Sequence, residues 1–341
     1  MPSLKAIRKR IASVKNTQKI TKAMKMVAAA RLRRAQDAVQ SLRPYANHLG
    51  QLAHDLASHL SEEPEADAVA AAPADAQPEA ETAKDEAAAA GAKVPTPEQL
   101  RRILIGKSER RVRLVVVSSD RGLAGAYNSN VFRRTERQVT EIKLEDGREV
   151  ELLILGRKGR DFFRRRPHKI VGELGGVDPK TASARAAELA QSLTRALFND
   201  ECDAVYVVFN EFKTAASVNV KVRRLLPVEV AAGAAQGAKK GGPKDEAALD
   251  EPKTLVDFLY EPDRDAVLAH LVPLYLTTEL QRIFLEAIAS ELGARMSAMD
   301  SASRNAKEMI SRLTLQYNRA RQALITKELM EIIGGAEALK G

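Results

Sequence analysis

Apolar residues recur at alternating intervals of four and three through residues 1–60. This spacing predicts a long helix with an apolar seam that packs against a partner helix. Pro44 is expected to bend this helix locally or to mark its end. The seam positions are Ile7, Ile11, Val14, Gln18, Thr21, Lys25, Ala28, Leu32, Ala35, Val39, Leu42, Ala46, Leu49, Ala53, Leu56 and Leu60.

The other end of the chain, residues 271–341, carries the same spacing, and no proline follows residue 273 there. At 1.5 Å per residue, each terminal helix would be on the order of 80 Å long. The first helix must end where the middle of the chain begins and the second must start where it finishes, so the two are expected to pair antiparallel as a coiled coil. The second seam comprises Ile288, Leu292, Arg295, Met299, Ala302, Ala306, Met309, Leu313, Gln316, Ala320, Ala323, Lys327 and Met330.

Strand-like and helix-like patterns alternate in residues 99–270, which predicts an α/β domain with a largely parallel sheet. We therefore expect an α/β foot domain that carries the long antiparallel coiled coil of the terminal helices. The expected strands are Val112–Ser119, Val150–Gly156, Ile170–Leu174, Asp203–Phe209 and Val218–Val228, and the expected helices are Asn128–Ile142 and Lys180–Phe198.

Two segments have the composition of insertions. Residues 61–98 are acidic and rich in alanine and proline, and residues 232–253 are similar in character. Such segments hold too few apolar side chains to order themselves, so both are expected to be disordered or mobile surface loops.

Glycine-containing turns follow two of the expected strands, in "VRLVVVSSDRGLAGAYNSN" at 112–130 and "LILGRKGRDFF" at 153–163. A strand, a glycine turn and a helix start are the parts of a phosphate cradle. Neither stretch has G-x-G-x-x-G or G-x-x-x-x-G-K-[ST], so we expect tight structural turns here, with a nucleotide site as the alternative.

Composition restricts the possible chemistry. Aromatic residues make up 4% of the chain, and the single cysteine, Cys202, allows neither an internal disulfide nor a multi-thiolate metal site. No cofactor or metal is expected. No apolar run approaches the ~20 residues that span a bilayer, so we expect a soluble, cytoplasmic protein without a membrane span.

Positive charge is concentrated at the N-terminus. Residues 1–44 contain twelve Lys and Arg and one acid, a net charge of 12 − 1 = +11 against +9 for the whole chain. This segment is expected to meet an acidic partner, which on charge alone could be nucleic acid, anionic lipid or protein. A basic coiled-coil nucleic-acid-binding protein is thus one alternative, and a dehydrogenase-like enzyme is another.

Several long motifs resemble the γ subunit of F-type ATP synthases. They include "IRKRIASVKNTQKITKAMKMVAAARLRRAQ" at 7–36 and "ARMSAMDSASRNAKEMISRLTLQYNRARQALITKELMEIIGGAEAL" at 294–339. The glycine turn "SSDRGLAGAYNSN" and "LYEPDRDAVLAHLVPLYLTTEL" are similar to the same family. The resemblance covers nearly the whole chain apart from the two insertions.

This resemblance implies a central-stalk rotor without a catalytic, cofactor or metal site of its own. The implied partners are the α and β subunits of the catalytic hexamer, the ε subunit and the membrane ring of c subunits, with no nucleic acid. The implied location is peripheral, on the cytoplasmic face of the bacterial inner membrane, in a proton-translocating complex. The paired cysteines of chloroplast relatives are absent, so thiol regulation is not expected.

The resemblance also implies contact residues. Lys22 and Lys25 would face an acidic loop of the β subunit, with an ordinary solvated lysine as the alternative. The candidates for contact with the stator ring are Arg295, Arg321, Gln322, Thr326 and Glu328, with hydrogen bonds inside the rod as the alternative. The loop at 210–217, with Phe212, Lys213 and Thr214, would meet the c ring, and 156–169 would meet acidic loops or lipid headgroups.

Overall fold

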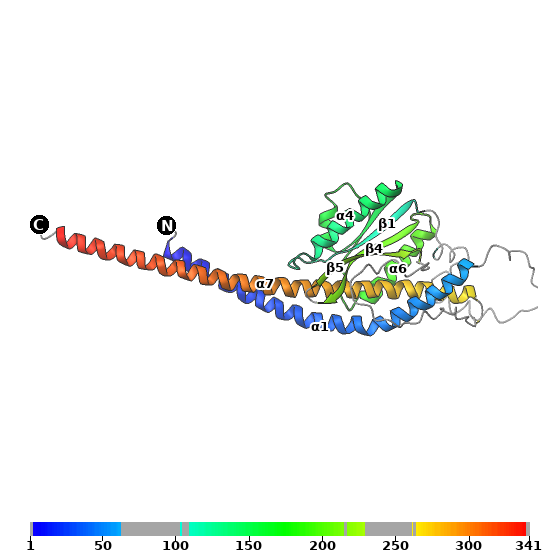
Figure 1. The fold of residues 1–341 in the computed structure, drawn as a ribbon, viewed down its shortest axis with the longest axis horizontal. Coiled ribbons are helices and arrows are strands. Elements are labelled where there is room, and N and C mark those ends of the chain that lie inside the picture. Colours follow the sequence, from blue (N-terminus) through cyan, green and yellow to red (C-terminus); the bar gives the residue numbers. More distant parts are fainter. Residues whose placement is uncertain are drawn as a thin grey trace, which may run out of the picture.

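The computed structural model describes residues 3–62, 103, 109–214, 217–228, 261 and 264–338. Two long helices, α1 (Leu4–Glu62) and α7 (Arg264–Ala338), form a rod, and an α/β foot packs against one part of it (Figure 1). The start of α1 and the end of α7 both lie on the part of the rod that extends away from the foot, with the end of α7 reaching further, so the helices are antiparallel as predicted (Figure 1). Apart from residues 61 and 62, the two predicted insertions lie outside the described residues.

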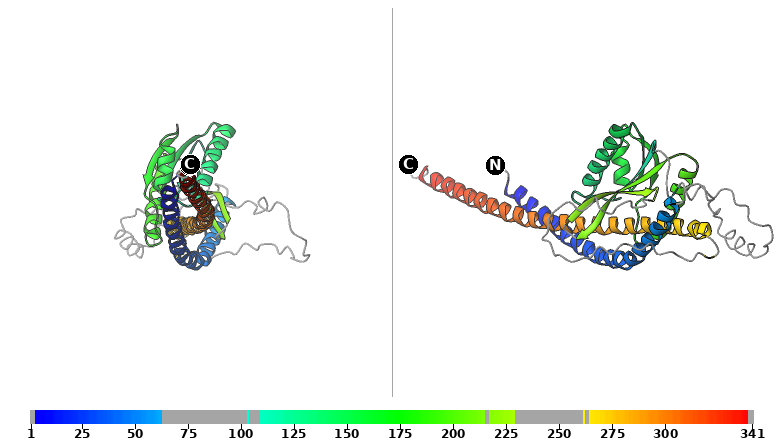
Figure 2. Two further views of the ribbon diagram at one scale, coloured as in Figure 1. Left: turned by 90° about the vertical axis from the view of Figure 1, so that its left-hand side faces the viewer. Right: turned by 45° about the vertical axis from the view of Figure 1, so that its right-hand side comes forward.

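The seam of α1 follows the predicted positions. Every seam position from Ile7 to Ala53 is buried or half-buried. The helix continues through Pro44, and α1 bows around α7 rather than running straight beside it (Figure 2). The prediction of a paired coiled coil is confirmed.

The seam of α7 is covered only where α1 reaches it. Leu292, Met299 and Leu313 are buried, whereas every residue from 321 to 335 is exposed. The reason is length: α1 begins at Leu4, and Arg8 already pairs with Tyr317, so α7 continues alone toward its C-terminus. The helix also begins at residue 264, earlier than the predicted boundary at 271.

The foot contains a five-stranded sheet of order β3-β2-β1-β4-β5. Strands β1 (Arg111–Val117), β2 (Glu149–Leu155), β3 (Lys169–Leu174) and β4 (Ala204–Thr214) are parallel, and β5 (Ser217–Leu226) returns antiparallel to β4. The predicted, largely parallel sheet is therefore present.

Helices cover both faces of this sheet. Helices α4 (Tyr127–Asp146) and α5 (Arg157–Phe163) lie on one face, and α6 (Ala182–Phe198) lies on the other beside α7 (Figure 1). The central strand β1 is buried on both sides, and its side chains are apolar apart from Arg111 and Arg113, the latter paired with Glu151. Helix α7 supplies core side chains such as Ile283 and Phe284, so shaft and foot share one hydrophobic core.

Candidate functional site

The turn after β1, residues 120–126, is called the glycine turn below. Just before it, the Ser119 N–H donates to Asn128 Oδ1 over 3.1 Å, and Asn128 Nδ2 donates to Ser119 Oγ over 2.8 Å. Asp120 Oδ1 accepts hydrogen bonds from the N–H groups of Arg157 and Gly176, over 2.9 and 3.1 Å. Asp120 thus ties the loops that follow β1, β2 and β3 to one another.

The turn after β2 is closed in the same way. The Lys158 N–H donates to the Ser119 carbonyl over 3.1 Å, and the Gly159 N–H donates to Ser118 Oγ over 2.9 Å. Gly156 has φ 94°, and a Cβ there would lie 2.2 Å from the Ser118 carbonyl oxygen. The glycine is needed for the contact between the two turns, and the amides of Arg157, Lys158 and Gly159 are already bonded, so they are not available to cradle a phosphate.

The described residues offer little other ligand chemistry. They contain no group of three or more His, Cys, Asp or Glu side chains that could hold a metal ion. Cys202 is buried, which raises the pKa of its thiol and keeps it protonated. Among the helices of the part of the chain that is described, none is long and apolar enough to cross a membrane.

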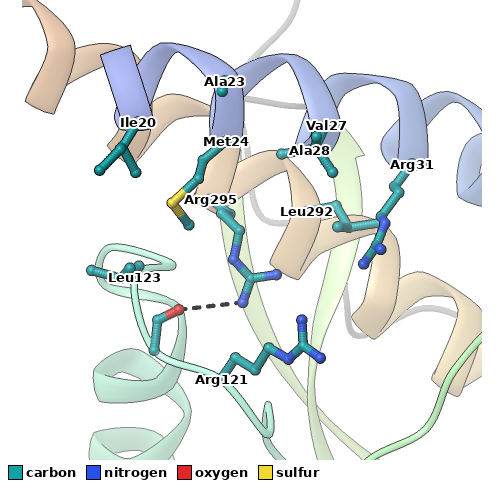
Figure 3. A pocket seen from close by; sticks show the side chains of 11 residues that line it. Ile20, Ala23, Met24, Val27, Ala28, Arg31, Arg121, Leu123, Leu292 and Arg295 are labelled. Atoms are coloured by element: carbon teal, nitrogen blue, oxygen red, sulfur yellow. Dashed lines mark hydrogen bonds between the residues drawn. The ribbon is translucent and has the colours of Figure 1, made fainter. Parts of the chain in front are cut away.

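A hollow of about 500 Å³, called the shaft–foot hollow below, lies where α1, α7 and the glycine turn meet (Figure 3). Its apolar walls include Ile20 and Leu123, which are 60% and 64% exposed. Three guanidinium groups, of Arg31, Arg121 and Arg295, stand around it. The full lining is Ile20, Ala23, Met24, Val27, Ala28, Arg31, Arg121, Gly122, Leu123, Leu292 and Arg295. Such a surface suits a partner segment that presents apolar and acidic side chains together.

Arg295 is bonded within the chain. Its Nη2 donates to Glu291 Oε1 over 2.6 Å and to the Gly122 carbonyl over 3.3 Å, and its side chain is 13% exposed (Figure 3 shows the second bond). Burial raises the pKa of the Glu291 carboxyl, and the charge of Arg295 opposes that rise. In the chain by itself, Arg295 is therefore bonded both inside the rod, to Glu291, and to the foot, at Gly122.

The two N-terminal lysines have different surroundings. Lys25 Nζ lies 2.5 Å from Asp300 Oδ1, so it links α1 to α7, and this bond lowers the pKa of the Asp300 carboxyl. Lys22 is exposed and has no hydrogen bond or ion pair within the described ranges. Of the two, Lys22 is the side chain that is free to meet a partner.

The C-terminal candidates Arg321, Gln322, Thr326 and Glu328 are all exposed. Their one bond among the described residues runs from Thr326 Oγ1 to the Gln322 carbonyl, over 3.0 Å along the same helix. Large apolar side chains accompany them, with exposures from 45% to 70%. These are Leu324, Ile325, Leu329, Met330, Ile332 and Ile333.

The foot candidates are divided between core and surface. Phe212 is buried in the core, and its carbonyl accepts a hydrogen bond from Arg43 Nη2 over 3.2 Å. Lys213 and Thr214 are exposed at the end of β4. Thus Lys213 and Thr214 could contact a partner with their side chains, whereas Phe212 supports the strand from inside.

The basic segment at 156–169 is largely paired with acids. The ion pairs are Arg157–Asp120, Arg160–Asp161, Arg164–Glu173, Arg166–Glu136 and Lys169–Glu151. Lys158 and Arg165 remain exposed without such a pair in the described chain. Its surface is therefore less cationic than the sequence suggests.

Sequence analysis missed the buried acids of α7. Glu279 pairs with Arg223 and with Arg282, the latter over 2.7 Å, and Glu286 lies 3.5 Å from Arg43. Burial raises the pKa of both carboxyls. The two acids are seven residues apart among apolar positions, and this spacing was the signal that could have revealed them.

Fold and site together define a class: a subunit with an α/β foot and a two-helix shaft that acts through its surfaces. The sequence matches the ATP synthase family over residues 3–339. The chain belongs to the ATP synthase gamma-chain family. It is accordingly a non-catalytic subunit, and the nucleic-acid-binding and dehydrogenase alternatives find no support.

The similar proteins span the whole chain. The ATP synthase gamma chain of Sorangium cellulosum is 48% identical over 340 residues and that of Anaeromyxobacter sp. is 44% identical, each covering 100% of both chains. A chain in a cryo-EM structure of Euglena gracilis mitochondrial ATP synthase with OSCP, F1 and the c-ring has a TM-score of 0.57 at 16% identity. That similarity covers 98% of this chain and 94% of the other, and it supports the shared fold.

Proposed function

We propose that this chain is the rotor of a proton-translocating F-type ATP synthase. Its rotation would couple the membrane ring of c subunits to the conformational cycle of the catalytic hexamer of α and β subunits. The observation that carries the proposal is the uncovered end of α7. Every residue from 321 to 335 is exposed there, and the large apolar side chains are at least 45% exposed. A solitary helix of this character requires a partner that encloses it.

The α and β subunits are the proposed partners of the shaft. Arg321, Gln322, Thr326 and Glu328 would meet the stator ring at the tip, and Lys22 would meet an acidic loop of β lower down. Lys25 and Arg295 would also contact the α and β subunits, although in the chain by itself Lys25 pairs with Asp300 and Arg295 pairs with Glu291. Arg31 and Arg121, which line the shaft–foot hollow, add further positive charge at this level of the shaft.

The ε subunit and the c ring are the proposed partners of the foot. Lys213 and Thr214, at the exposed end of β4, are the side chains proposed to meet the c ring, with Phe212 buried behind them. The complex would be peripheral to the bacterial inner membrane, with this chain on the cytoplasmic face. No nucleic acid, cofactor or direct membrane span belongs to this function.

The mechanism follows from asymmetry. Because α1 bows around α7, the shaft presents different surfaces in different directions (Figure 2). A turning shaft would therefore contact each β subunit differently in succession and favour a different conformation of each nucleotide site. A rotor can shift these conformations only by the difference in its contact energy with them.

Reconstitution tests this function. The wild-type chain, combined with α, β, ε and the membrane sector in vesicles, is expected to support ATP-driven proton pumping. A chain ending at Ala320 should fold with the same stability, because residues 321–335 are exposed, and should fail to support coupled pumping. If vesicles with the wild-type chain pumped no more protons than vesicles that lack the chain, the proposal would be contradicted.

A further inference from the structure

We propose that the glycine turn is a coupling contact between foot and shaft, in addition to the hydrophobic core that they share. On this view the turn, which has the layout of a phosphate cradle, packs against α7 in place of a ligand. The inference rests on the proposed rotor function and adds to it the site at which torque passes between foot and shaft.

The turn packs closely against small residues of α7. Ala124, Tyr127 and Ala294 form one buried cluster, exposed by 3%, 1% and 7%. A Cβ built on Gly125 would lie 3.6 Å from Ala298 Cβ and 3.9 Å from the Ala294 carbonyl oxygen. The backbone of the turn therefore lies directly on the face of α7 that carries Ala294 and Ala298.

A polar bond reinforces this packing. Arg295 lies between the two alanines in sequence, and its guanidinium reaches the Gly122 carbonyl over 3.3 Å (Figure 3). Glu291 holds the same guanidinium over 2.6 Å, one helical turn earlier. The side chains of Arg295 and Glu291 are only 13% and 19% exposed, so this pair holds the guanidinium in place, whereas the bond to the exposed Gly122 lies at the surface.

The turn is also fixed on the side of the foot. Asp120 joins it to the loops after β2 and β3, and Asn128 joins it to the start of α4. Gly125 has φ 57°, a conformation that glycine adopts without strain. A rigid turn bound to the sheet edge and seated on α7 would transmit a twisting force rather than absorb it.

The position of the turn along α7 supports this role. Beyond Ala298, the described side-chain bonds from α7 to other elements lead to α1, through Lys25–Asp300 and Arg8–Tyr317. Leu123 of the turn faces the shaft–foot hollow together with Ile20 and Met24 of α1 (Figure 3). The glycine turn thus lies where the shaft leaves the foot, in contact with one helix and facing the other.

A disulfide between the turn and α7 tests the proposal. The 3.6 Å separation of the Cβ positions at 125 and 298 lies within the range that a disulfide requires. The single native cysteine, Cys202, is buried, so the pair Gly125→Cys with Ala298→Cys can be oxidised selectively. The reduced pair is its own reference, because any cost of a side chain at φ 57° is present before and after oxidation.

In the reconstituted complex, oxidation of this pair is expected to leave the ratio of proton pumping to ATP hydrolysis within about twofold of the reduced pair. Loss of pumping upon oxidation would show that the turn must move against α7, and failure of the disulfide to form would show that the turn does not sit there. Either result would overturn the proposal.

Weakening the polar bond gives the complementary test. Arg295→Ala is expected to lower the ratio of pumping to hydrolysis about threefold or more, because a charge-assisted bond is lost. Oxidation of the cysteine pair in the same chain should restore the ratio, since a covalent bond replaces the lost one. Arg304→Ala, on an exposed part of α7, is the matched control and should leave the ratio unchanged.

The outcomes separate the two proposals. If Arg295→Ala uncouples and oxidation does not restore coupling, Arg295 acts on the stator and the coupling role of the turn is wrong. The coupling role of the turn would also be overturned if the ratio of pumping to hydrolysis were the same for Arg295→Ala as for Arg304→Ala. If the wild-type chain supports no pumping, the rotor function itself fails, whatever the variants do.

Discussion

At the residue scale, the acids of α7 show how burial and pairing act against each other. Glu279, Glu286 and Glu291 lie on one helix, each near an arginine of this chain. Burial raises the pKa of all three carboxyls, and the neighbouring arginines only reduce the rise. Such pairs fix how the two side chains meet, but they add little to the free energy of unfolding, because the cost of burying the charges offsets their attraction.

Glu286→Gln tests this balance through pH. Because the folded-state pKa of Glu286 lies above its ordinary 4.5, protonation favours the folded chain, and this contribution is lost as the pH rises through the raised pKa. The free energy of unfolding of the variant, relative to wild type, should therefore increase as the pH rises above 4.5. Denaturant unfolding at several pH values measures it.

Glu188→Gln is the control, because that side chain is exposed and pairs with Arg185 on its own helix. Its relative free energy of unfolding should not change over the same pH range. An equally flat profile for Glu286→Gln would show that burial does not dominate at this carboxyl.

At the element scale, polar links set the register of the two-helix shaft. The seam is rich in alanine, and a uniform small seam can slip. Arg8 pairs with Tyr317 and Lys25 pairs with Asp300, and the two residue numbers add up to 325 in both links. Two links with the same offset hold one antiparallel alignment of α1 and α7.

Exchange of charges across the shaft tests this register. Lys25→Asp places two carboxylates opposite each other and should lower the free energy of unfolding by no more than about 1 kcal/mol, since the pair is partly exposed. Adding Asp300→Lys should recover most of the loss. Asp300→Lys combined with Lys22→Asp should not restore the free energy of unfolding, because Lys22 has no such partner in the described chain. Recovery in both combinations would mean that net charge, rather than pairing, decides stability.

The helices and strands could be predicted from the sequence far better than the bonding partners of individual side chains. The spacing placed the seam from Ile7 to Ala53, and alternation gave the parallel sheet, because both depend on local periodicity. The bond from Arg295 to Gly122 could not be predicted, because Gly122 lies 173 residues away in sequence and meets Arg295 only after folding. Burial of Phe212 was missed for the same reason.

At the scale of the whole molecule, two levels of the shaft should respond differently to substitution. Lys22→Ala with Lys25→Ala removes partly exposed charges, so pumping should fall modestly and the effect should weaken with salt. Arg321→Ala with Gln322→Ala removes side chains that the stator would enclose, at a cost of about 1–3 kcal/mol, so pumping should fall more and independently of salt.

ATP hydrolysis and proton pumping, measured in membranes with each double variant across a salt series, compare the two levels. The thermal stability of the isolated chain should change little for Arg321→Ala with Gln322→Ala, because both residues are exposed. Equal and salt-independent defects at both levels would show that the shaft is not enclosed as proposed.

The whole chain should also bind no nucleotide by itself. Neither turn has the glycine and lysine spacing of a phosphate site, and after β2 the amides of Arg157, Lys158 and Gly159 are already bonded to Asp120, Ser119 and Ser118. Calorimetry of the isolated chain with MgATP should show no stoichiometric heat. A micromolar dissociation constant would contradict this interpretation of both turns.

The rotor role is tested most directly by watching the foot turn. An exposed position such as Arg165 can be changed to cysteine and carry a visible probe, because the single native cysteine is buried. With the α and β hexamer fixed to a surface, ATP is expected to drive stepwise rotation of the probe in one direction. Continued ATP hydrolysis with a stationary probe would contradict the account.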